Sequence, residues 1–429
     1  MLTLAIFAVL LALILLNLPI VVAIAGTAIL FFVGLGQGGF LAMLPQRVFS
    51  GCNGFVLLAV PFFILAGNLM NTGGITNRIF RFCRALVGHV PGGLGQVSVV
   101  SSMIFSGMSG SAVADAAGLG QIQHKAMVDN GYREDISAAI VAAASTIGPV
   151  IPPSIPFVLY SALTLVSVER LFLAGMIPGL LMGLAMMVAI GAMAKPRGFP
   201  RSARADWKEV RESFAKAILP LLAPVIIIGG ILSGIFTPTE ASVVVCLYAV
   251  FLGFLYGDLT FADLPGIFWK SIQQSTALLL IMGAANFFGW FTIYQRIPDS
   301  IIAALTGANM GTAGVLAIVI VLILALGCFL EGNAIFFITI PIFLPIAQRY
   351  GIDLVNFGVT MTLLIMIGNL TPPVGMCLFA VSSFSKVSMG RLTREVWPYL
   401  VAILAITLII AYVPAIATWL PNAVRGPGM

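Results

Sequence analysis

Two short polar segments interrupt otherwise apolar stretches, and each contains a Pro-Pro step. The first reads IGPVIPPS from Ile147 to Ser154, and the second reads IGNLTPPV from Ile367 to Val374, 220 positions later. A Pro inside a helix removes a backbone hydrogen bond and clashes with the preceding turn. Each step therefore predicts a broken helix whose free carbonyl and N–H groups need a watery cavity or a ligand.

A second matched pair of interruptions lies upstream of the two Pro-Pro steps. Gly and Ser break the apolar stretch at Ser106–Ser111, and Glu331-Gly332-Asn333 breaks it in the other half. Carbonyl oxygens freed by such breaks, together with Ser, Thr and Asn oxygens, are suitable ligands for a hard cation. The N-termini of half-helices carry partial positive charge and attract an anion. The pattern predicts one cation site in each half, flanking one anion site.

The elements that must hold these segments are membrane-spanning helices. Hydrophobic residues make up 60% of the 429 residues and charged residues only 8%, whereas soluble domains carry about 25% charged residues. The apolar runs are continuous, while transmembrane strands would alternate. At about 20 residues per span, we expect an all-α polytopic membrane protein with about 11–12 helical spans.

The matched interruptions predict two repeats joined by a charged linker. We expect a first repeat at 1–194, a cytoplasmic or interfacial linker helix at 195–216, and a second repeat at 217–429. The linker is rich in Lys and Arg, which favour the cytoplasmic side. Matched breaks in two halves are typical of secondary transporters with a site at the repeat interface. Whether the repeats are inverted, which we favour, or parallel depends on the number of spans.

Each repeat has a predicted hairpin and a predicted broken helix. The hairpins are expected near 92–125 and 314–347, and the broken helices at 136–165 and 357–385. Arg residues and apolar residues occupy different faces of Ile75–Val87, which indicates an amphipathic arm at the membrane interface.

Polar residues inside the apolar stretches are candidates for function, because a charge within a span is costly. Asp115 follows the first Gly-Ser interruption and Glu331 begins the second, so both fit either a direct role with ions or substrate, or hydrogen bonding that stiffens the segment. Glu240 ends the segment TPTE, which is typical of a capped helix N-terminus. Asn68 and Asn286 occupy similar apolar helices 218 positions apart.

At these motifs the chain resembles the large membrane subunit (M subunit) of tripartite ATP-independent periplasmic (TRAP) transporters, over essentially its whole length. The motifs that carry the resemblance are PFFILAGNLMN at Pro61–Asn71, FSGMSGSAVADAAGLG at Phe105–Gly120, ASTIGPVIPPSIPF at Ala144–Phe157, GIFTPTEAS at Gly234–Ser242, FLEGNAI at Phe329–Ile335 and GNLTPPVGM at Gly368–Met376. The resemblance implies an elevator-type transporter with scaffold and transport domains and two re-entrant hairpins. It also implies sodium-driven import of an organic anion through the bacterial inner membrane, with a small membrane Q subunit and a periplasmic substrate-binding P subunit.

Carried onto the matching positions, the resemblance implies two sodium sites and an anion site between them. The first sodium site would use Ser106, Ser109, Gly110, Ser111, Ser145, Gly148 and Pro149. The second would use Gly332, Asn333, Gly368, Thr371 and the carbonyl of Met376. The anion would lie near Pro153, Ser154, Asn333 and Pro373, with Asn68, Asp115 and Glu331 in supporting or coupling roles. None of the interrupted motifs contains Lys or Arg, so the anion's charge must be balanced by bound cations, N–H groups and hydroxyls.

Three functions compete on this pattern. The first is the sodium-coupled import of a carboxylate, for which the motifs slightly favour sialic acid over a C4-dicarboxylate. The second is a membrane subunit of a partner-driven sodium pump. The third, an intramembrane enzyme, is disfavoured because no zinc, Ser-Lys or paired-Asp motif stands out. We expect no organic cofactor and no nucleic-acid partner.

Overall fold

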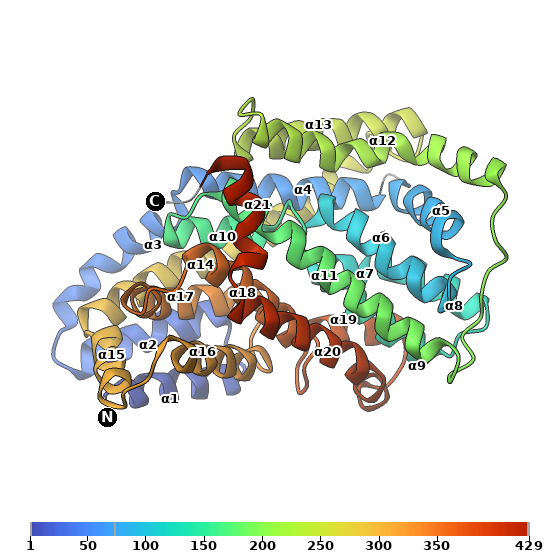
Figure 1. The fold of residues 1–429 in the computed structure, drawn as a ribbon. Helices are drawn as coiled ribbons and strands as arrows, with labels where there is room; N and C mark the ends of the chain where they lie inside the picture. Colours follow the sequence, from blue (N-terminus) through green and yellow to red (C-terminus); the bar gives the residue numbers. More distant parts are fainter. Residues whose placement is uncertain (1, 73, 427–429) are drawn as a thin grey trace.

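The computed structural model describes residues 2–72 and 74–426, and for residues 72 and 106–109 it describes the backbone alone. The regular elements of these ranges are all helices (Figure 1). Those of the first half are α1 (Leu2–Leu15), α2 (Ile20–Gly34), the 3-10 turn η1 (Gly38–Met43), α3 (Leu44–Cys52), η2 (Phe55–Leu58), α4 (Ala59–Thr72), α5 (Ile75–Val87), α6 (Gly93–Ser109), α7 (Ala112–Ala117), α8 (Leu119–Asp129), α9 (Glu134–Ser145), α10 (Ile155–Thr164) and α11 (Val168–Ala194).

The second half repeats this order at the spacing of the two Pro-Pro steps. Its helices are α12 (Trp207–Leu232), α13 (Pro238–Tyr256), α14 (Leu264–Tyr294), α15 (Ile297–Gly307), α16 (Thr312–Gly327), α17 (Gly332–Arg349), α18 (Leu354–Gly368), α19 (Met376–Ser385), α20 (Met389–Tyr412) and α21 (Ala415–Arg425). The starts of α7 and α17 have the same separation in the chain as the Pro-Pro steps, and so do the starts of α9 and α18. The halves differ where α3 and α4 meet at a bend of 60°, because the matching α14 is one continuous helix.

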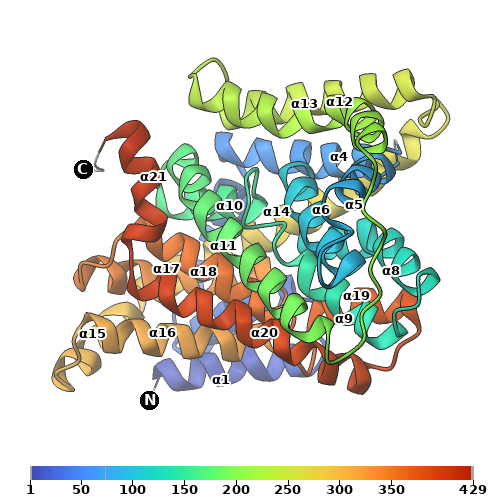
Figure 2. The same cartoon turned by 45° about the vertical axis from the view of Figure 1, so that its right-hand side comes forward.

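Contacts divide most of the helices into two sets. We call α1–α5 and α12–α14 the frame, in which α12 packs on α5 and α13, and α14 packs on α2, α3 and α4. We call α6–α11 and α16–α21 the core, centred on mutual contacts among α9, α11, α18 and α20. In both views α12 and α13 run side by side along one edge of the molecule (Figures 1 and 2). The frame meets the core mainly where α14 contacts α17 and where α5 and α4 contact α6.

The apolar helices show a multi-pass membrane protein. Within the described ranges, six helices are long and apolar enough to cross a membrane, or seven if the bent α3–α4 pair is one span. Counting only helices of at least 18 residues therefore gives fewer spans than the 11–12 expected from the sequence. The difference arises because eight further apolar helices have only 10–17 residues; among them, α10 and α19 are each one half of a broken helix.

The structure corrects the expected linker helix at 195–216. Residues 195–206 are irregular, and Trp207–Lys216 forms the first turns of α12, which continues to Leu232. Asp206 caps this helix by accepting a hydrogen bond from the backbone N–H of Trp207 at 2.8 Å. Once nucleated, a helix extends cooperatively, so the charged segment and the following apolar span form one element.

Ion pairs at the linker end link helices within the frame and segments within the core. Arg78 Nη1 lies 2.6 Å from Asp258 Oδ2, and Arg81 makes two contacts of 3.0 Å with Glu209. Across the core, Arg197 pairs with Glu395.

The amphipathic arm α5 has the bounds predicted from the sequence, and its apolar face is buried against α6 and α12.

A buried glutamine fastens α8 to α6. The side chain of Gln123 is 1% exposed. Its Nε2 lies 3.1 Å from the Ser98 carbonyl, 3.0 Å from Ser101 Oγ and 3.1 Å from Ser102 Oγ. The amide nitrogen of Gln123 therefore lies within hydrogen-bonding distance of three oxygen atoms of α6 that are buried between α6 and α8.

Gln123→Leu should destabilise the protein by about 1–3 kcal/mol, because buried oxygens lose their donor. Thermal unfolding of the purified protein in detergent measures the effect as a lower midpoint. Gln121→Leu, on the exposed face of the same helix, is the matched control, and equal midpoints for the two variants would contradict the proposed contribution.

Candidate functional site

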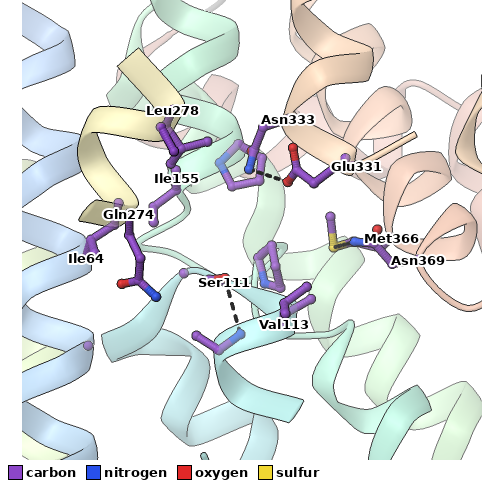
Figure 3. A pocket seen from close by; sticks show the side chains of 18 of the residues that line it. Ile64, Ser111, Val113, Ile155, Gln274, Leu278, Glu331, Asn333, Met366 and Asn369 are labelled. Atoms are coloured by element: carbon purple, nitrogen blue, oxygen red, sulfur yellow. Dashed lines mark hydrogen bonds between the residues drawn. The ribbon is translucent and has the colours of Figure 1, made fainter. Parts of the chain in front are cut away.

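Two helix caps at matched positions form the tips of the interrupted segments. Ser111 Oγ accepts a hydrogen bond from the Ala114 N–H at 3.4 Å. The Glu331 carboxylate accepts one from the Ala334 N–H at 3.2 Å and another from Asn333 Nδ2 at 2.7 Å (Figure 3). A side-chain oxygen at this position satisfies a free N–H at the start of a helix. Ser in one half and Glu in the other thus meet the same backbone requirement.

The first tip lies directly on the first Pro-Pro break. Gly110 has a φ of +61°, and a Cβ there would lie 3.2 Å from both the Pro153 carbonyl and the Ile155 N–H nitrogen. Ser154 is fully buried, and its hydroxyl donates to the Pro149 carbonyl while capping α10. The hydroxyl of Ser154 therefore stabilises the broken backbone itself.

A buried carboxylate joins the same group. Asp115 is 1% exposed, and a Cβ on Gly148 would collide with its Oδ2. Ser145, one turn earlier, is 2% exposed and donates its hydroxyl to the Ala142 carbonyl at 2.8 Å. A carboxyl side chain is thus packed against the backbone of the first break.

The second tip contacts the second break in a corresponding way. A Cβ on Gly332 would lie 2.5 Å from Ile365 Cγ2 and 3.6 Å from Asn369 Nδ2, so here the glycine packs on side chains of the second break. A Cβ on Gly368 would lie 2.6 Å from the Cα of Gly327, so α16 and α18 touch backbone to backbone. Thr371 Oγ1 donates to the Ile367 carbonyl at 2.8 Å.

A cavity of about 280 Å³ lies between the two tips, the two breaks and the frame (Figure 3). The first residues of α10 and α17 face it, so two helix N-termini with partial positive charge are directed at one space. Among the described residues that line it there is no Lys or Arg. Its polar lining consists of Asn68, Ser111, Gln274, Glu331, Asn333 and Asn369.

The frame contributes an amide pair to this cavity. Asn68 Nδ2 on α4 donates to Ser271 Oγ and to Gln274 Oε1 on α14, each at 2.9 Å. Within the described residues, Gln274 Nε2 has no hydrogen-bond partner, and the side chain projects into the cavity opposite the second tip (Figure 3). The frame therefore presents oriented N–H donors to any molecule bound between the tips.

Comparison with known proteins identifies the family. A family model described as "Tripartite ATP-independent periplasmic transporter, DctM component" matches residues 7–416. The chain belongs to this family. The sialic acid TRAP transporter large permease protein SiaM of Vibrio cholerae is 40% identical over 413 residues, which cover 96% of each chain. The C4-dicarboxylate TRAP transporter large permease protein DctM of Pseudomonas aeruginosa is 39% identical over 380 residues, 88% of this chain and 89% of that protein.

Solved structures of other transporters share the fold. The YdaH transporter of Alcanivorax borkumensis superposes with a TM-score of 0.62 over 90% of both chains at 15% identity. MtrF of Neisseria gonorrhoeae superposes with a TM-score of 0.59 at 14% identity, over 90% of this chain and 85% of that one. At these identities the likeness concerns the fold alone.

The structure of this TRAP permease brings part of the predicted site to the cavity wall. The predicted residues that line the cavity are Asn68, Gly110, Ser111, Pro149, Glu331, Gly332 and Asn333. Those that do not line it are Asp115, Ser145, Gly148, Pro153, Ser154, Gly368, Thr371, Pro373 and Met376. The side chains of Ser106 and Ser109 lie outside the described residues. Sodium and substrate ligation by all these residues stays a prediction.

Two polar cavity residues of the permease were missed from the sequence, Asn369 and Gln274. Asn369 is the position that matches Pro149 in the second repeat, so the repeat register could have found it. Gln274 falls in the short polar stretch KSIQQS at 270–275, which lies within α14. The proposed match of Asn68 with Asn286 is wrong, because Asn286 binds the Arg47 carbonyl at 2.8 Å, away from this cavity.

The capping interpretation of Glu240 is confirmed. The Thr237 N–H donates to Glu240 Oε2 at 2.8 Å, and the Glu240 N–H contacts Thr237 Oγ1 at 3.3 Å. This reciprocal capping box begins α13 and does not line the cavity between the tips.

Gly327→Ala should force α16 away from the second break. The new Cβ would lie 2.8 Å from the Cα of Gly368, and a backbone atom cannot move aside as a flexible side chain can. Overpacking of this kind costs about 1–3 kcal/mol, which thermal unfolding would detect. Gly314→Ala on the same helix meets nothing closer than 4.0 Å and should be neutral or slightly stabilising. If Gly327→Ala unfolded at the same midpoint as Gly314→Ala, the close contact between α16 and α18 would not limit the size of residue 327.

Proposed function

We propose that this TRAP large permease imports an organic anion coupled to sodium. The observation that supports this most is the cavity itself, where matched tips from two repeats face one space with no basic side chain among its described lining residues. Helix N-termini supply only partial positive charge. Bound sodium ions supply the rest, because the tips and breaks offer the carbonyl, hydroxyl and amide oxygens that a hard cation prefers.

The two proposed sodium sites lie where each tip meets its own break. In the first, Gly110 lies on the backbone of Pro153 and Ile155, and Asp115 lies beside Gly148. Ser111 and Pro149 line the cavity next to this contact. In the second, Gly332 lies against the side chains of Ile365 and Asn369, in the break that also contains Gly368 and Thr371. The anion is placed in the cavity between these two contacts, where Asn333 and Gln274 supply N–H donors.

The proposed movement is that of an elevator, with the frame as scaffold and the core as transport domain. In this arrangement α1, α2, the bent α3–α4 pair, the broken α9–α10 pair and α11 each cross the membrane, while α6–α8 enters and returns. An odd number of crossings inverts the second half relative to the first. The linker end is then cytoplasmic, and of the 21 basic residues only five fall at the opposite end, namely Arg47, Arg170, Arg296, Arg349 and Arg425. That asymmetry matches the positive-inside rule for a bacterial inner-membrane protein.

The proposed substrate is a carboxylate, with sialic acid slightly favoured over a C4-dicarboxylate. The V. cholerae relative is named for sialic acid, but the P. aeruginosa relative named for C4-dicarboxylates is nearly as similar.

The proposed partners are a small membrane Q subunit and a periplasmic P subunit that delivers the substrate. A relative in Oleidesulfovibrio alaskensis, 36% identical, is named an isethionate TRAP transporter permease protein DctMQ, and this chain matches 59% of its length. A partner-driven sodium pump gains no support from relatives that are transport permeases.

Uptake into proteoliposomes tests this function. Labelled N-acetylneuraminate or succinate should enter only when an inward sodium gradient, the Q subunit and the binding protein are all present. Replacing external sodium with potassium should abolish the uptake, because the anion's charge is then uncompensated. Uptake that persists without sodium would contradict the proposed coupling, and uptake of neither acid would contradict the substrate class.

Thr371→Ala should raise the sodium concentration for half-maximal uptake about tenfold, the effect of losing one oxygen contact to an ion. Thr418→Ala is the matched control, because Thr418 makes the same type of hydrogen bond, to the Pro414 carbonyl at 3.0 Å, far from the tips. Ser109→Ala is expected to act like Thr371→Ala at the first site. Sodium activation that is unchanged in both variants, at normal protein yield, would contradict the assigned sites.

A further inference from the structure

A second polar cavity, of about 580 Å³, lies at the linker end of the frame, where α5, α12 and α13 meet. Its lining includes three basic side chains, Arg78 and Arg81 from α5 and Lys216 from α12. Tyr256 and Asp258, at the end of α13, complete the polar wall. No residue of this lining belongs to the cavity between the tips.

One of the three cations is held in place by its neighbours. The guanidinium of Arg78 lies 3.8 Å from the centre of the Tyr256 ring, and its Nη1 lies 2.6 Å from Asp258 Oδ2. Gly74 has a φ of +62°, and a Cβ there would collide with that same carboxylate oxygen. The backbone at Gly74 thus packs directly against the Arg78–Asp258 ion pair. An arginine side chain held in one conformation in this way loses little conformational entropy when it binds an anion.

The lining of this cavity carries more positive than negative side chains, and two acidic residues outside it, Glu209 and Glu212, lie near Arg81. The lining holds three cations and one carboxylate, and Arg81 also shares its charge with Glu209 outside the lining. Lys216 is exposed and makes no ion pair within 4.0 Å among the described residues. Its ammonium is therefore available to a ligand, in a wall that already contains an oriented guanidinium.

The surroundings of the cavity match the boundary between headgroups and hydrocarbon. The arm α5 is amphipathic, with Arg residues on one face and a buried apolar face. On α12, the first turns are charged, whereas Ile218, Leu222 and Val225 beyond Lys216 are exposed apolar residues. Only 28% of the 18-residue apolar stretch of α12 is buried within the protein, which is the lowest share among the six candidate spans in the described ranges. Basic pockets between transmembrane helices on the cytoplasmic side bind anionic lipid headgroups.

We propose that this cavity binds the phosphate of an anionic phospholipid, with the acyl chains lying along the exposed apolar face of α12. Arg78, Arg81 and Lys216 contact the phosphate oxygens, and Tyr256 lies beside the headgroup. The lipid joins the arm α5 to α12 and so stabilises the frame. This binding requires only that the frame lies in a membrane and is independent of what the core transports.

Native mass spectrometry of the purified full chain in detergent tests the proposal, with dioleoylphosphatidylglycerol as the probe. One lipid should bind saturably and raise the unfolding midpoint. Lys216→Gln should weaken that binding about fivefold, the effect of one basic residue near an anionic headgroup. Lys208→Gln removes the same charge from an exposed position of the same helix outside the cavity and should bind like the unchanged protein.

Two further ligands separate the possible sources of the phosphate. Dioleoylphosphatidylethanolamine should bind more weakly than phosphatidylglycerol, and inorganic phosphate should give no midpoint shift at the same concentration. Equal binding of phosphatidylglycerol by Lys216→Gln and Lys208→Gln would overturn the site. A shift with inorganic phosphate equal to that with the lipid would overturn the lipid as ligand, and equal binding of both lipids would overturn the requirement for an anionic headgroup.

Discussion

The structure depends on one constraint, which is that backbone groups freed by a broken helix must find partners inside the membrane. An unsatisfied N–H or C=O in hydrocarbon costs several kcal/mol, so each break needs an element packed directly against it. Glycines make this approach possible, since Gly110 lies on the first break and Gly327 touches Gly368 in the second at backbone distance. Side chains supply the remaining bonds, with the Ser154 hydroxyl on the Pro149 carbonyl as the clearest case.

The same constraint explains why the tips of the two halves look different in sequence but act alike in structure. Helix α7 and helix α17 both begin where the chain turns back, and each first turn needs an oxygen acceptor. Ser111 supplies it in one half, and Glu331 supplies it at the matching position of the other. A carboxylate at such a position is thus explained by capping before any role with ions is invoked. The sequence alone left these two roles of Glu331 equally open.

Local patterns predicted the parts of the fold that local forces determine. The bounds of α5, the Pro-Pro breaks and the cap at Glu240 each follow from a few neighbouring residues. Errors arose where tertiary packing decides the outcome. The charged linker merges with α12, and Gln274 becomes a cavity residue only because α4 places Asn68 beside it. The spacing of Asn68 and Asn286 differs from the register that relates the helices of the two halves, and the two side chains bond different partners.

The lining of the cavity also determines how coupling would operate in the proposed transporter. A buried Arg or Lys would hold an organic anion whether or not sodium was present, and such a site would not couple the two. Among the described lining residues the fixed donors are helix N-termini, amides and the Ser111 hydroxyl. In the proposed transporter, the binding free energy of the anion would therefore depend on cations held at the two tips. Linkage is reciprocal, so the anion must raise sodium affinity by the same factor. In the proposed arrangement each half would provide one cation contact, and the anion would lie between them as the counterion of both.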